Sequence, residues 1–440
     1  MILRFGTDGW RGRAYDELTV DFVRLLGDVA ASVLGGDTFL IGRDTRESGP
    51  DLEQAFAAGL ARQGVRIKSL HVVPTPAVAW LSAADTVAAA MISASHNPYT
   101  DNGIKLFAPG GVKLSDATQV RIQDELDRRG ASPAPISNAA IIDCRSELVR
   151  YCDALVASLE GRDLRPLRIV IDCANGSNSE VAPAVLAAVG ALVDVIHDAP
   201  DGRNINDHCG STYPGDLQRA VVAHGADLGL AFDGDADRVL AVDHRGQLID
   251  GDQIIAICAI DRHERGVLAR NSVAVTVMSN LGFRLAMQAR GIEVIETPVG
   301  DRNVLEALER EGATFGGEQS GHVIFSDLAT TGDGLLTALQ LLDVVCRSGR
   351  PLADLAADSM TRLPQVLRNV RVPAPVADLD ARLRPAVARV EAELAGQGRV
   401  LIRPSGTEAL VRVMVEAPSE AAAAAFAQEL ADAVAALAAE

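Results

Sequence analysis

The chain has 440 residues, which is too long for one ordinary domain and indicates about three or four. Its formal net charge of −18 disfavours nucleic acid as a partner, because binding to phosphates needs basic patches. No apolar run approaches the roughly 18 uninterrupted residues of a membrane span, and the N-terminus has no apolar signal core. These features favour a cytoplasmic enzyme without a membrane partner, and the six scattered cysteines are expected to be small buried residues.

The first part of the chain alternates strand-like and helical patterns. Helices are expected over 20–34 and 52–63, and strands over 39–41, 65–73 and 87–92. Pro74-Thr75-Pro76 predicts a turn between two of these segments. The alternation argues for a sheet that is covered by helices.

A polar segment follows the strand expected over 87–92. It reads Ser93-Ala94-Ser95-His96-Asn97-Pro98 and continues into the turn signals Asp101-Asn102-Gly103 and Lys105. Ser95 and His96 are therefore expected where a strand gives way to a loop, a position at which α/β proteins often carry their chemistry. Taken alone, the segment is equally well explained as a polar loop that closes a strand.

Two further cycles of strand and helix follow the looser segment 131–135. One cycle ends in Asp233-Gly234-Asp235-Ala236-Asp237-Arg238 after a strand expected over 228–232, and the next reaches Gly317-Glu318-Gln319-Ser320-Gly321-His322. Each of the three cycles delivers one polar, glycine-containing loop, which predicts an internal structural repeat.

The pattern changes after residue 363. Strands expected over 366–372, 399–402 and 410–416, with helices over 379–394 and 421–437, predict a smaller domain. We therefore expect an α/β protein with three similar α/β domains containing mixed sheets, followed by a smaller C-terminal α+β domain. The expected boundaries are 1–145, 146–245, 246–363 and 364–440.

Asp233, Asp235 and Asp237 alternate along the chain. In an extended segment such side chains project to one side, where three negative charges repel one another unless a cation lies among them. An all-oxygen set of ligands selects a hard ion such as magnesium. An EF-hand is excluded because its glycine and glutamate positions are Arg238 and His244 here. The alternative is a solvated acidic turn.

Two other loops contain groups that suit a phosphorylated sugar. Arg403-Pro404-Ser405-Gly406-Thr407, with Arg412 nearby, has the guanidinium, hydroxyl and main-chain N–H donors of an anion pocket, although an ordinary turn explains it equally well. Glu318, Ser320 and His322 suit a polyol, and the same groups could also bind their own backbone.

These loops together resemble the four signature loops of the α-D-phosphohexomutase family in order and spacing, over essentially the whole chain. The motifs that carry the resemblance are Ser93–Pro98, Asp233–Arg238, Gly317–His322 and Arg403–Glu408. The segments Phe5–Gly12 and Val411–Glu416, together with Gln319, are most like the bacterial branch that acts on glucosamine phosphate. The branches that act on mannose and glucose phosphates usually carry Met in place of Gln319. Asn303 and Ala409 depart from the pattern, since relatives often have Tyr and Pro there.

The resemblance implies a role for each matching residue, in four domains around a central cleft. Ser95 would carry a phosphoryl group and, with Asp233, Asp235 and Asp237, bind one Mg²⁺ per chain, while Arg238 would support the metal loop. Lys105 and Arg11 would be cations beside the reacting phosphate, and either Lys105 or His322 would be the acid/base. The implied substrate contacts are His96, Glu318 and Ser320 for the sugar, and Arg403, Ser405, Gly406, Thr407 and Arg412 for the phosphate that is not transferred.

The implied reaction interconverts glucosamine 6-phosphate and glucosamine 1-phosphate through a phosphoserine enzyme and a bisphosphorylated sugar, for UDP-N-acetylglucosamine and cell-wall precursor synthesis. Glucosamine or glucose 1,6-bisphosphate would be the activator, a hexosamine phosphate the partner, and a homodimer is compatible with the resemblance. The nearest alternative is a phosphomannomutase or phosphoglucomutase. A non-catalytic phosphosugar-binding relative and a metal-dependent phosphatase are alternatives of other classes.

Overall fold

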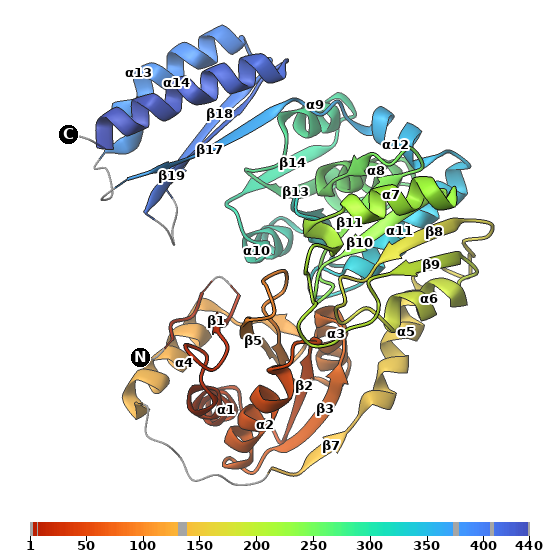
Figure 1. Ribbon diagram of the computed structural model, residues 1–440, viewed down its shortest axis with the longest axis vertical. Coiled ribbons are helices and arrows are strands. Elements are labelled where there is room, and N and C mark those ends of the chain that lie inside the picture. The colour runs from red at the N-terminus through yellow and green to blue at the C-terminus, as the bar shows by residue number, and fades with distance from the viewer. Residues whose placement is uncertain (1–2, 7, 131–138, 373–377, 405–408, 439–440) are drawn as a thin grey trace. The chain divides into compact units, whose positions relative to one another are not determined.

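The computed structural model describes residues 3–6, 8–130, 139–372, 378–404 and 409–438 (Figure 1). The chain divides into two compact units, which are described one at a time: Met1–Met278 with Ile292–Ala357, and Ser279–Gly291 with Asp358–Glu440. The first unit holds three mixed sheets and the second holds one antiparallel sheet. The predicted fold class, three α/β parts and a smaller α+β part, is confirmed, while the domain boundaries and the central cleft stay predictions.

The first sheet runs in the order β1-β5-β4-β2-β3-β7, with β6 beside β5. Its strands are β1 (Trp10–Arg13), β2 (Thr38–Arg43), β3 (Arg66–Val72), β4 (Ala88–Ile92), β5 (Asp101–Ala108), β6 (Val112–Lys113) and β7 (Ile141–Asp143). The helices of this part are α1 (Val20–Leu34), α2 (Gly49–Ala61), α3 (Thr75–Asp85) and α4 (Asp116–Arg129).

Helices cover both faces of this sheet because its central strand is apolar on both sides. The Phe39 ring of β2 lies 5.7 Å from the Phe56 ring of α2, and Phe39 belongs to the core that α1, α2 and α4 share with the sheet. Gly42 is on the opposite face by the alternation of a strand. A Cβ there would lie 2.4 Å from Val78 of α3, so this glycine lets α3 approach closely.

Two local predictions in this part are corrected. Asp101-Asn102-Gly103 begins strand β5 instead of forming a turn, because β5 pairs with β1 on one side and β4 on the other. The buried Asn102 side chain donates to Ser48 Oγ at 2.9 Å and accepts the N–H of Gly103. At Pro74-Thr75-Pro76 the chain turns directly into helix α3, which begins at Thr75 with a proline in its first turn.

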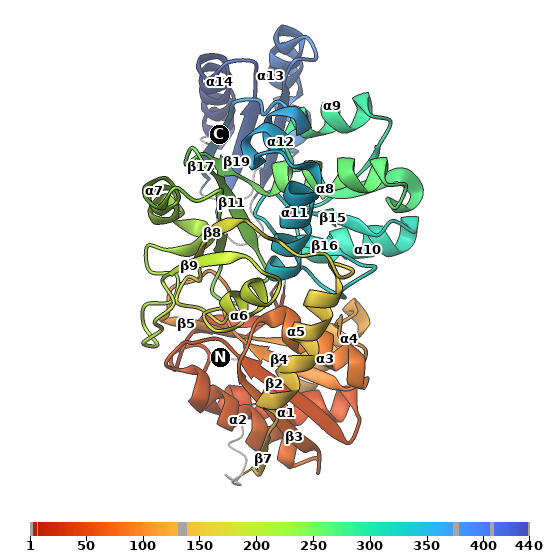
Figure 2. The same ribbon diagram turned by 90° about the vertical axis from the view of Figure 1, so that its right-hand side faces the viewer.

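The second and third sheets repeat the plan of the first. The second has the order β12-β11-β10-β8-β9 and the third β14-β13-β15-β16. Their strands are β8 (Arg168–Asp172), β9 (Leu192–Ile196), β10 (Leu228–Phe232), β11 (Val239–Asp243), β12 (Leu248–Ile249), β13 (Ser272–Thr276), β14 (Glu293–Thr297), β15 (Phe315–Gly317) and β16 (Val323–Phe325). The helices are α5 (Leu148–Ala157), α6 (Val181–Ala188), α7 (Gly215–His224), α8 (Gly251–Glu264), α10 (Asp301–Glu311), α11 (Gly334–Ser348) and α12 (Leu352–Ser359), with short 3-10 turns η1 (Arg145–Glu147), η2 (Gly210–Thr212) and η3 (Ala269–Asn271). Figure 2 shows α5 beside α3, α6 and α11.

Each of the three sheets places one polar loop at the same point of its topology. The loop joins a strand that is parallel to its inner neighbour (β4, β10 or β15) to an antiparallel strand (β5, β11 or β16). Open α/β sheets bind ligands at the carboxyl ends of their strands. Ser95, the aspartate triplet and Glu318 all lie in these loops.

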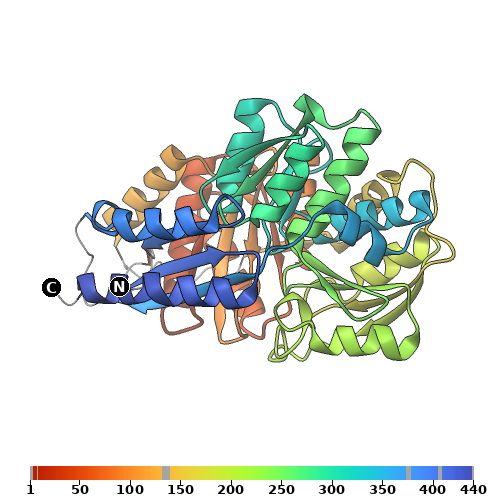
Figure 3. The same cartoon turned by 90° about the horizontal axis from the view of Figure 1, so that it is seen from above.

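The second unit contains the order β17-β19-β18, with β17 (Gln365–Arg371), β18 (Arg399–Pro404), β19 (Leu410–Glu416), α9 (Leu281–Ala289), α13 (Leu379–Leu394) and α14 (Glu420–Ala438). Helices α13 and α14 lie side by side over one face of the sheet (Figures 1 and 3). Of the helices in the described residues, α14 is long and apolar enough to cross a membrane by length and composition. Its Ala427, Leu430 and Val434 pack in the core of this unit.

Candidate active site

Ser95 lies in the loop after β4 and points at the aspartate triplet. Its side chain is buried, and its backbone has the left-handed φ of 53°. The Oγ atom donates a hydrogen bond to Asp233 Oδ2 at 2.8 Å and lies 3.3 Å from His96 Nδ1. The predicted contact between the serine loop and the aspartate loop is therefore present in the structure.

The three aspartates of the β10–β11 loop converge, but on a turn in which Ala236 has a positive φ of 60°, and not on the extended segment that was expected. Asp233 and Asp235 are fully buried and Asp237 is 5% exposed, and ligand oxygens of all three lie within 4.8 Å of one another. Burial, followed by the charges of the other two carboxylates, raises the pKa of Asp233 well above its ordinary value. Within the described residues, Asp235 Oδ1 and Asp237 Oδ1 have no hydrogen-bond partner, and such buried oxygens suit a cation. The cluster is therefore a candidate metal centre.

Lys105 of β5 is the cation closest to this cluster among the described residues. Its Nζ lies 2.8 Å from Asp235 Oδ2, 3.1 Å from Asp237 Oδ2 and 3.3 Å from Asp8 Oδ2. Burial favours a lower pKa for Lys105, but the three carboxylates outweigh burial and hold the pKa well above its ordinary value. Lys105 is accordingly an ammonium group in this arrangement.

A chain of charged side chains continues from Asp237 through His322. His322 Nδ1 lies 3.7 Å from Asp237 Oδ1, and its Nε2 lies 3.4 Å from Asp301 Oδ2. Asp301 is also paired with Lys113, which binds Asp8 Oδ1 at 2.7 Å. Burial favours a lower pKa for His322, but its pairing with Asp237 and Asp301 raises the pKa instead.

Arg238 and His96 lie beside Ser95 and Asp233. The backbone N–H of Arg238 donates to Asp233 Oδ1 at 3.2 Å, and its guanidinium lies 3.2 Å from His96 Nδ1. Burial and the charges of Arg238 and Arg11 lower the pKa of His96 to about 4. His96 is therefore a neutral hydrogen-bonding group at neutral pH.

Other predicted site residues are less enclosed. Glu318 Oε1 accepts the backbone N–H of Gly300 at 3.1 Å, while Ser320 is exposed. Arg11 of β1 lies 3.9 Å from Asp8 Oδ2 with 31% of its side chain exposed. Gln319 donates to Asp250 Oδ2 at 3.4 Å.

The predicted phosphate loop belongs to the second unit. Arg403 of β18 and Arg412 of β19 are cross-strand neighbours, so their side chains leave the sheet on the same face. Partial burial and the charge of Arg412 lower the pKa of Arg403. Two cations placed together in this way suit an anion. Ser405, Gly406 and Thr407 lie outside the described residues.

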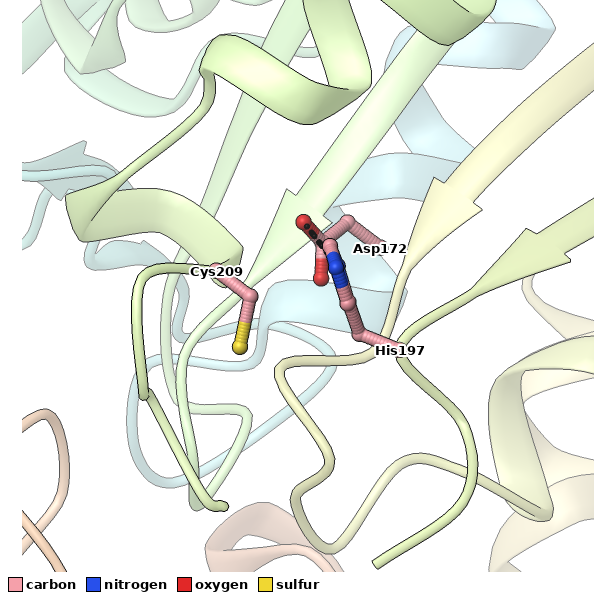
Figure 4. Close-up of side chains that lie close together, drawn as sticks. All are labelled: Asp172, His197 and Cys209. Carbon is pink, nitrogen blue, oxygen red and sulfur yellow. Dashed lines mark ion pairs between the residues drawn. The ribbon is translucent and has the colours of Figure 1, made fainter.

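A second set of metal-type side chains lies close together (Figure 4): Asp172 at the end of β8, His197 after β9 and Cys209 before η2. His197 Nδ1 lies 3.0 Å from Asp172 Oδ2, and its Nε2 lies 3.4 Å from Asp216 Oδ2. The hydrogen bond with Asp172 raises the pKa of His197, which favours an imidazolium without a free lone pair.

Asp172 and Cys209 are also poor metal ligands as they stand. Asp172 accepts the N–H groups of Ala174 and Gly210, each at 2.9 Å. Burial raises the pKa of Cys209 to about 12, and the thiol is not a metal ligand while it stays protonated. We interpret the cluster as an ion pair that ties three loops together.

Several residues of the site were missed from the sequence. Thr75 donates to Asp235 Oδ2 at 2.6 Å, Asp8 pairs with Lys105, and Arg46 and Asn206 bind main-chain oxygens of the serine loop. Arg46 carried one usable signal, because it is a charged residue in the polar loop that follows the strand expected over 39–41. Asn206 lies in an irregular segment, and its contact with Ser95 spans 111 positions of sequence.

Comparison with known proteins covers all four parts of the chain. Residues 3–132, 149–246 and 250–363 match "Phosphoglucomutase/phosphomannomutase, alpha/beta/alpha" domains I, II and III, respectively. Residues 367–433 match the C-terminal domain of the same family.

Individual proteins give the same picture. The chain is 51% identical to the phosphoglucosamine mutase of Parafrankia sp. (strain EAN1pec) over 99% of both chains. A crystal structure of a phosphoglucomutase/phosphomannomutase family protein from Burkholderia thailandensis has a TM-score of 0.81 and 26% identity, covering 99% of this chain and 98% of that one. The Aspergillus fumigatus N-acetylphosphoglucosamine mutase, in complex with GlcNAc-6P and magnesium, has a TM-score of 0.71 and 20% identity, covering 100% and 96%. The chain belongs to the phosphoglucomutase/phosphomannomutase family.

Proposed function

We propose that this protein is an intramolecular phosphotransferase that interconverts glucosamine 6-phosphate and glucosamine 1-phosphate. The observation that carries the proposal is the 2.8 Å hydrogen bond from the Ser95 hydroxyl to Asp233, which places a phosphoryl acceptor beside a buried cluster of three carboxylates. The choice of a hexosamine phosphate is supported by the phosphoglucosamine mutase that is 51% identical over 99% of the chain.

We infer that the aspartate cluster binds one Mg²⁺ per chain. Asp233, Asp235 and Asp237, with the phosphorylated Ser95, would be its ligands, because all of them offer oxygen. The buried Oδ1 atoms of Asp235 and Asp237, which have no hydrogen-bond partner within the described residues, support this assignment. When bound, the ion neutralises charge that develops on the phosphoryl group. Arg238 supports the loop through its backbone contact with Asp233.

The reaction consists of two phosphoryl transfers. In the first, a sugar hydroxyl oxygen attacks the phosphorus of phosphorylated Ser95 and the bond from phosphorus to Oγ breaks. Of the two candidate acid/base residues, His322 can accept the hydroxyl proton when its imidazole is neutral, while Lys105, already an ammonium group, can donate a proton to the departing Oγ. The resulting glucosamine 1,6-bisphosphate turns around and returns its other phosphate to Ser95. Lys105 and Arg11 supply positive charge beside the phosphate, and glucosamine or glucose 1,6-bisphosphate recharges an enzyme that has lost its phosphoryl group.

We assign the remaining predicted residues to substrate binding. His96, Glu318 and Ser320 would bind sugar hydroxyls. The phosphate that is not transferred would be held by Arg403, Ser405, Gly406, Thr407 and Arg412, a role that the cross-strand placement of the two arginines supports. We also infer four domains with boundaries at 145, 245 and 363 and a cytoplasmic location, since phosphorylated sugars are too strongly charged to cross a membrane unaided.

The substrate is tested by assaying glucosamine, glucose and mannose 1-phosphates in parallel, with the same bisphosphate activator. We expect the highest kcat/KM for glucosamine 1-phosphate. A preference for mannose or glucose phosphate would replace this substrate by that of a phosphomannomutase or phosphoglucomutase. Free phosphate released faster than isomer is formed would indicate a metal-dependent phosphatase, and absence of both products would indicate a binding protein.

A further inference from the structure

We propose that Arg46 and Asn206 are positioning residues for Ser95. Both donate hydrogen bonds to the main-chain oxygens of Ser95 and Asn97, one from the loop after β2 and the other from the loop between β9 and η2. We call this pair the Arg46–Asn206 clamp. The inference rests on the proposed role of Ser95 as phosphoryl carrier and adds the residues that hold it in place.

Arg46 has no exposed side-chain surface, and its guanidinium is used almost entirely on this loop. Its two terminal nitrogens donate to Ser95 O and Asn97 O at 2.9 Å and to Asp101 O at 3.0 Å, and also to Pro98 O. Its Nε donates to Asp44 Oδ2 at 2.8 Å, which balances the charge. Because a guanidinium offers five donors in a rigid plane, lysine could not replace this set.

Asp44 extends the contact to the other side of the loop. Its Oδ2 also accepts the hydroxyl of Ser93 at 2.6 Å, and Ser93 Oγ accepts the N–H of Ser95 at 2.9 Å. The N–H and the C=O of Ser95 are thus both fixed, directly or through one intermediate, by Arg46 and Asp44.

Asn206, which lies in a loop of the second sheet, binds the carbonyl oxygens of Ser95 and Asn97 as well. Its Nδ2 donates to Ser95 O at 2.9 Å and to Asn97 O at 3.2 Å, and the residue is 6% exposed. Both neighbours are carbonyl oxygens, so the amide must present its nitrogen to them. Asn206 is itself held by its N–H, which donates to Ala174 O at 3.0 Å.

The clamp has a physical purpose because Ser95 is in an unfavourable backbone conformation. A non-glycine residue in the left-handed region is strained, because its Cβ lies too close to the following carbonyl oxygen, and it persists only where its surroundings over-determine it. Its φ of 53° sets the direction of the bond from Cα to Cβ, and hence the aim of Oγ at Asp233. Holding the adjacent peptide oxygen fixes that direction.

The clamp also touches the metal loop. A Cβ added at Gly234 would lie 2.7 Å from Asn206 Nδ2 and 2.8 Å from Ser95 O, so Gly234 occupies the point where the three loops meet. The ion pair of Asp172 and His197 is connected to the clamp through Ala174. Asp172 accepts the N–H of Ala174, and the carbonyl oxygen of Ala174 accepts the N–H of Asn206. The second cluster therefore supports the loop that carries Asn206.

The first test compares Asn206→Ala with Asp207→Ala, whose side chain lies on the same loop and is 68% exposed. The measurements are kcat and KM for glucosamine 1-phosphate, the rate at which glucose 1,6-bisphosphate phosphorylates Ser95 (followed by intact mass), and the melting temperature. Loss of two hydrogen bonds in the transition state corresponds to roughly a tenfold fall in rate. For Asn206→Ala we therefore expect kcat and the phosphorylation rate to fall about tenfold while KM stays within about twofold, and we expect Asp207→Ala to behave as the wild type.

Two more variants keep the result decisive if Asn206→Ala does not fold. Asn206→Ser retains one donor and should recover part of the phosphorylation rate, and Arg46→Lys should lower that rate by at least as much as Asn206→Ala. Wild-type rates of Ser95 phosphorylation in folded Asn206→Ser and Arg46→Lys, or a change confined to KM or melting temperature, would overturn the clamp. Wild-type protein that takes up no phosphoryl group would instead defeat the proposed function.

Discussion

Two clusters of three metal-type side chains lie in neighbouring loops of the first unit, and they have opposite properties. In each, the potential ligand atoms lie within 4.8 Å of one another. The cluster of Asp233, Asp235 and Asp237 consists of carboxylates alone and leaves two buried oxygens without hydrogen-bond partners among the described residues. The cluster of Asp172, His197 and Cys209 pairs its carboxylate with His197 at 3.0 Å, and burial raises the pKa of its thiol to about 12.

The difference teaches that proximity of ligands is not enough to identify a metal site. What matters is whether the donor atoms are already used and whether the charges already balance. The first cluster sets three carboxylates against the Lys105 ammonium and leaves two oxygens without hydrogen-bond partners in the described part of the chain. The second pairs its carboxylate with His197 and joins the loops that carry Ala174, His197 and Gly210. Four substitutions test this contrast.

Asp235→Asn should have the largest effect, because it replaces one carboxylate of the first cluster by a neutral amide of nearly the same size. A bound metal contributes several kcal/mol to charge stabilisation, so we expect kcat to fall by about 10³-fold or more. Elemental analysis should find much less than one metal ion per chain. Full metal content together with full activity would contradict the assignment.

Gly234→Ala tests the packing between the first cluster and the serine loop. The added Cβ would lie within 2.8 Å of Ser95 O, and overpacking of this kind costs about 1–3 kcal/mol. We expect a lower urea midpoint of unfolding and a lower rate of Ser95 phosphorylation. Gly246→Ala is unsuited as a control because of its positive φ of 79°. Gly215→Ala is the control, because the nearest atom to an added Cβ there belongs to the side chain of Arg219, at 3.5 Å.

Cys209→Ala tests the second cluster by removing its only sulfur. The thiol is buried and accepts a long contact from Asn175 Nδ2 at 3.9 Å, so we expect a stability loss of about 1 kcal/mol. Metal content should stay at the wild-type value. Loss of one metal ion per chain in Cys209→Ala would show that the second cluster is a metal centre.

His197→Gln should have the smallest effect, with a characteristic pH dependence. Because Asp172 raises the pKa of His197 above its ordinary 6.5, the ion pair contributes fully below that pH and is lost as the pH rises through the folded-state pKa. The wild type should therefore exceed the variant in unfolding free energy by up to about 1 kcal/mol near pH 6 and by less near pH 9. A difference that grows with pH would contradict the ion pair.

Much of the fold could be predicted because the hydrophobic periods are clear. Helix α1, strand β10 and helix α13 begin and end at the predicted residues. The failures occur where tertiary contacts override local signals. Asp101-Asn102-Gly103 is a turn by composition. In the structure it belongs to strand β5, which pairs with β1 on one side and with β4 on the other.

The parts of the candidate site that could be predicted are those whose residues lie together in one short sequence motif. The spacing of the three aspartates within one short loop indicates that they lie close together, although they do so on a turn and not on an extended segment. The position of Ser95 just after a buried strand indicates that it faces other loops. The residues that hold these groups could not be predicted, because Arg46, Asn206 and Asp8 act across long separations of sequence. Their roles depend on which carbonyl or ammonium group the fold places beside them.

The central claim is that Ser95 carries the phosphoryl group. Its most direct test is intact-protein mass spectrometry of wild type and Ser95→Ala after incubation with Mg²⁺ and glucose 1,6-bisphosphate. We expect the wild type to gain the mass of one phosphoryl group and to isomerise glucosamine 1-phosphate, and Ser95→Ala to do neither. Phosphorylation or full turnover of Ser95→Ala would contradict the account.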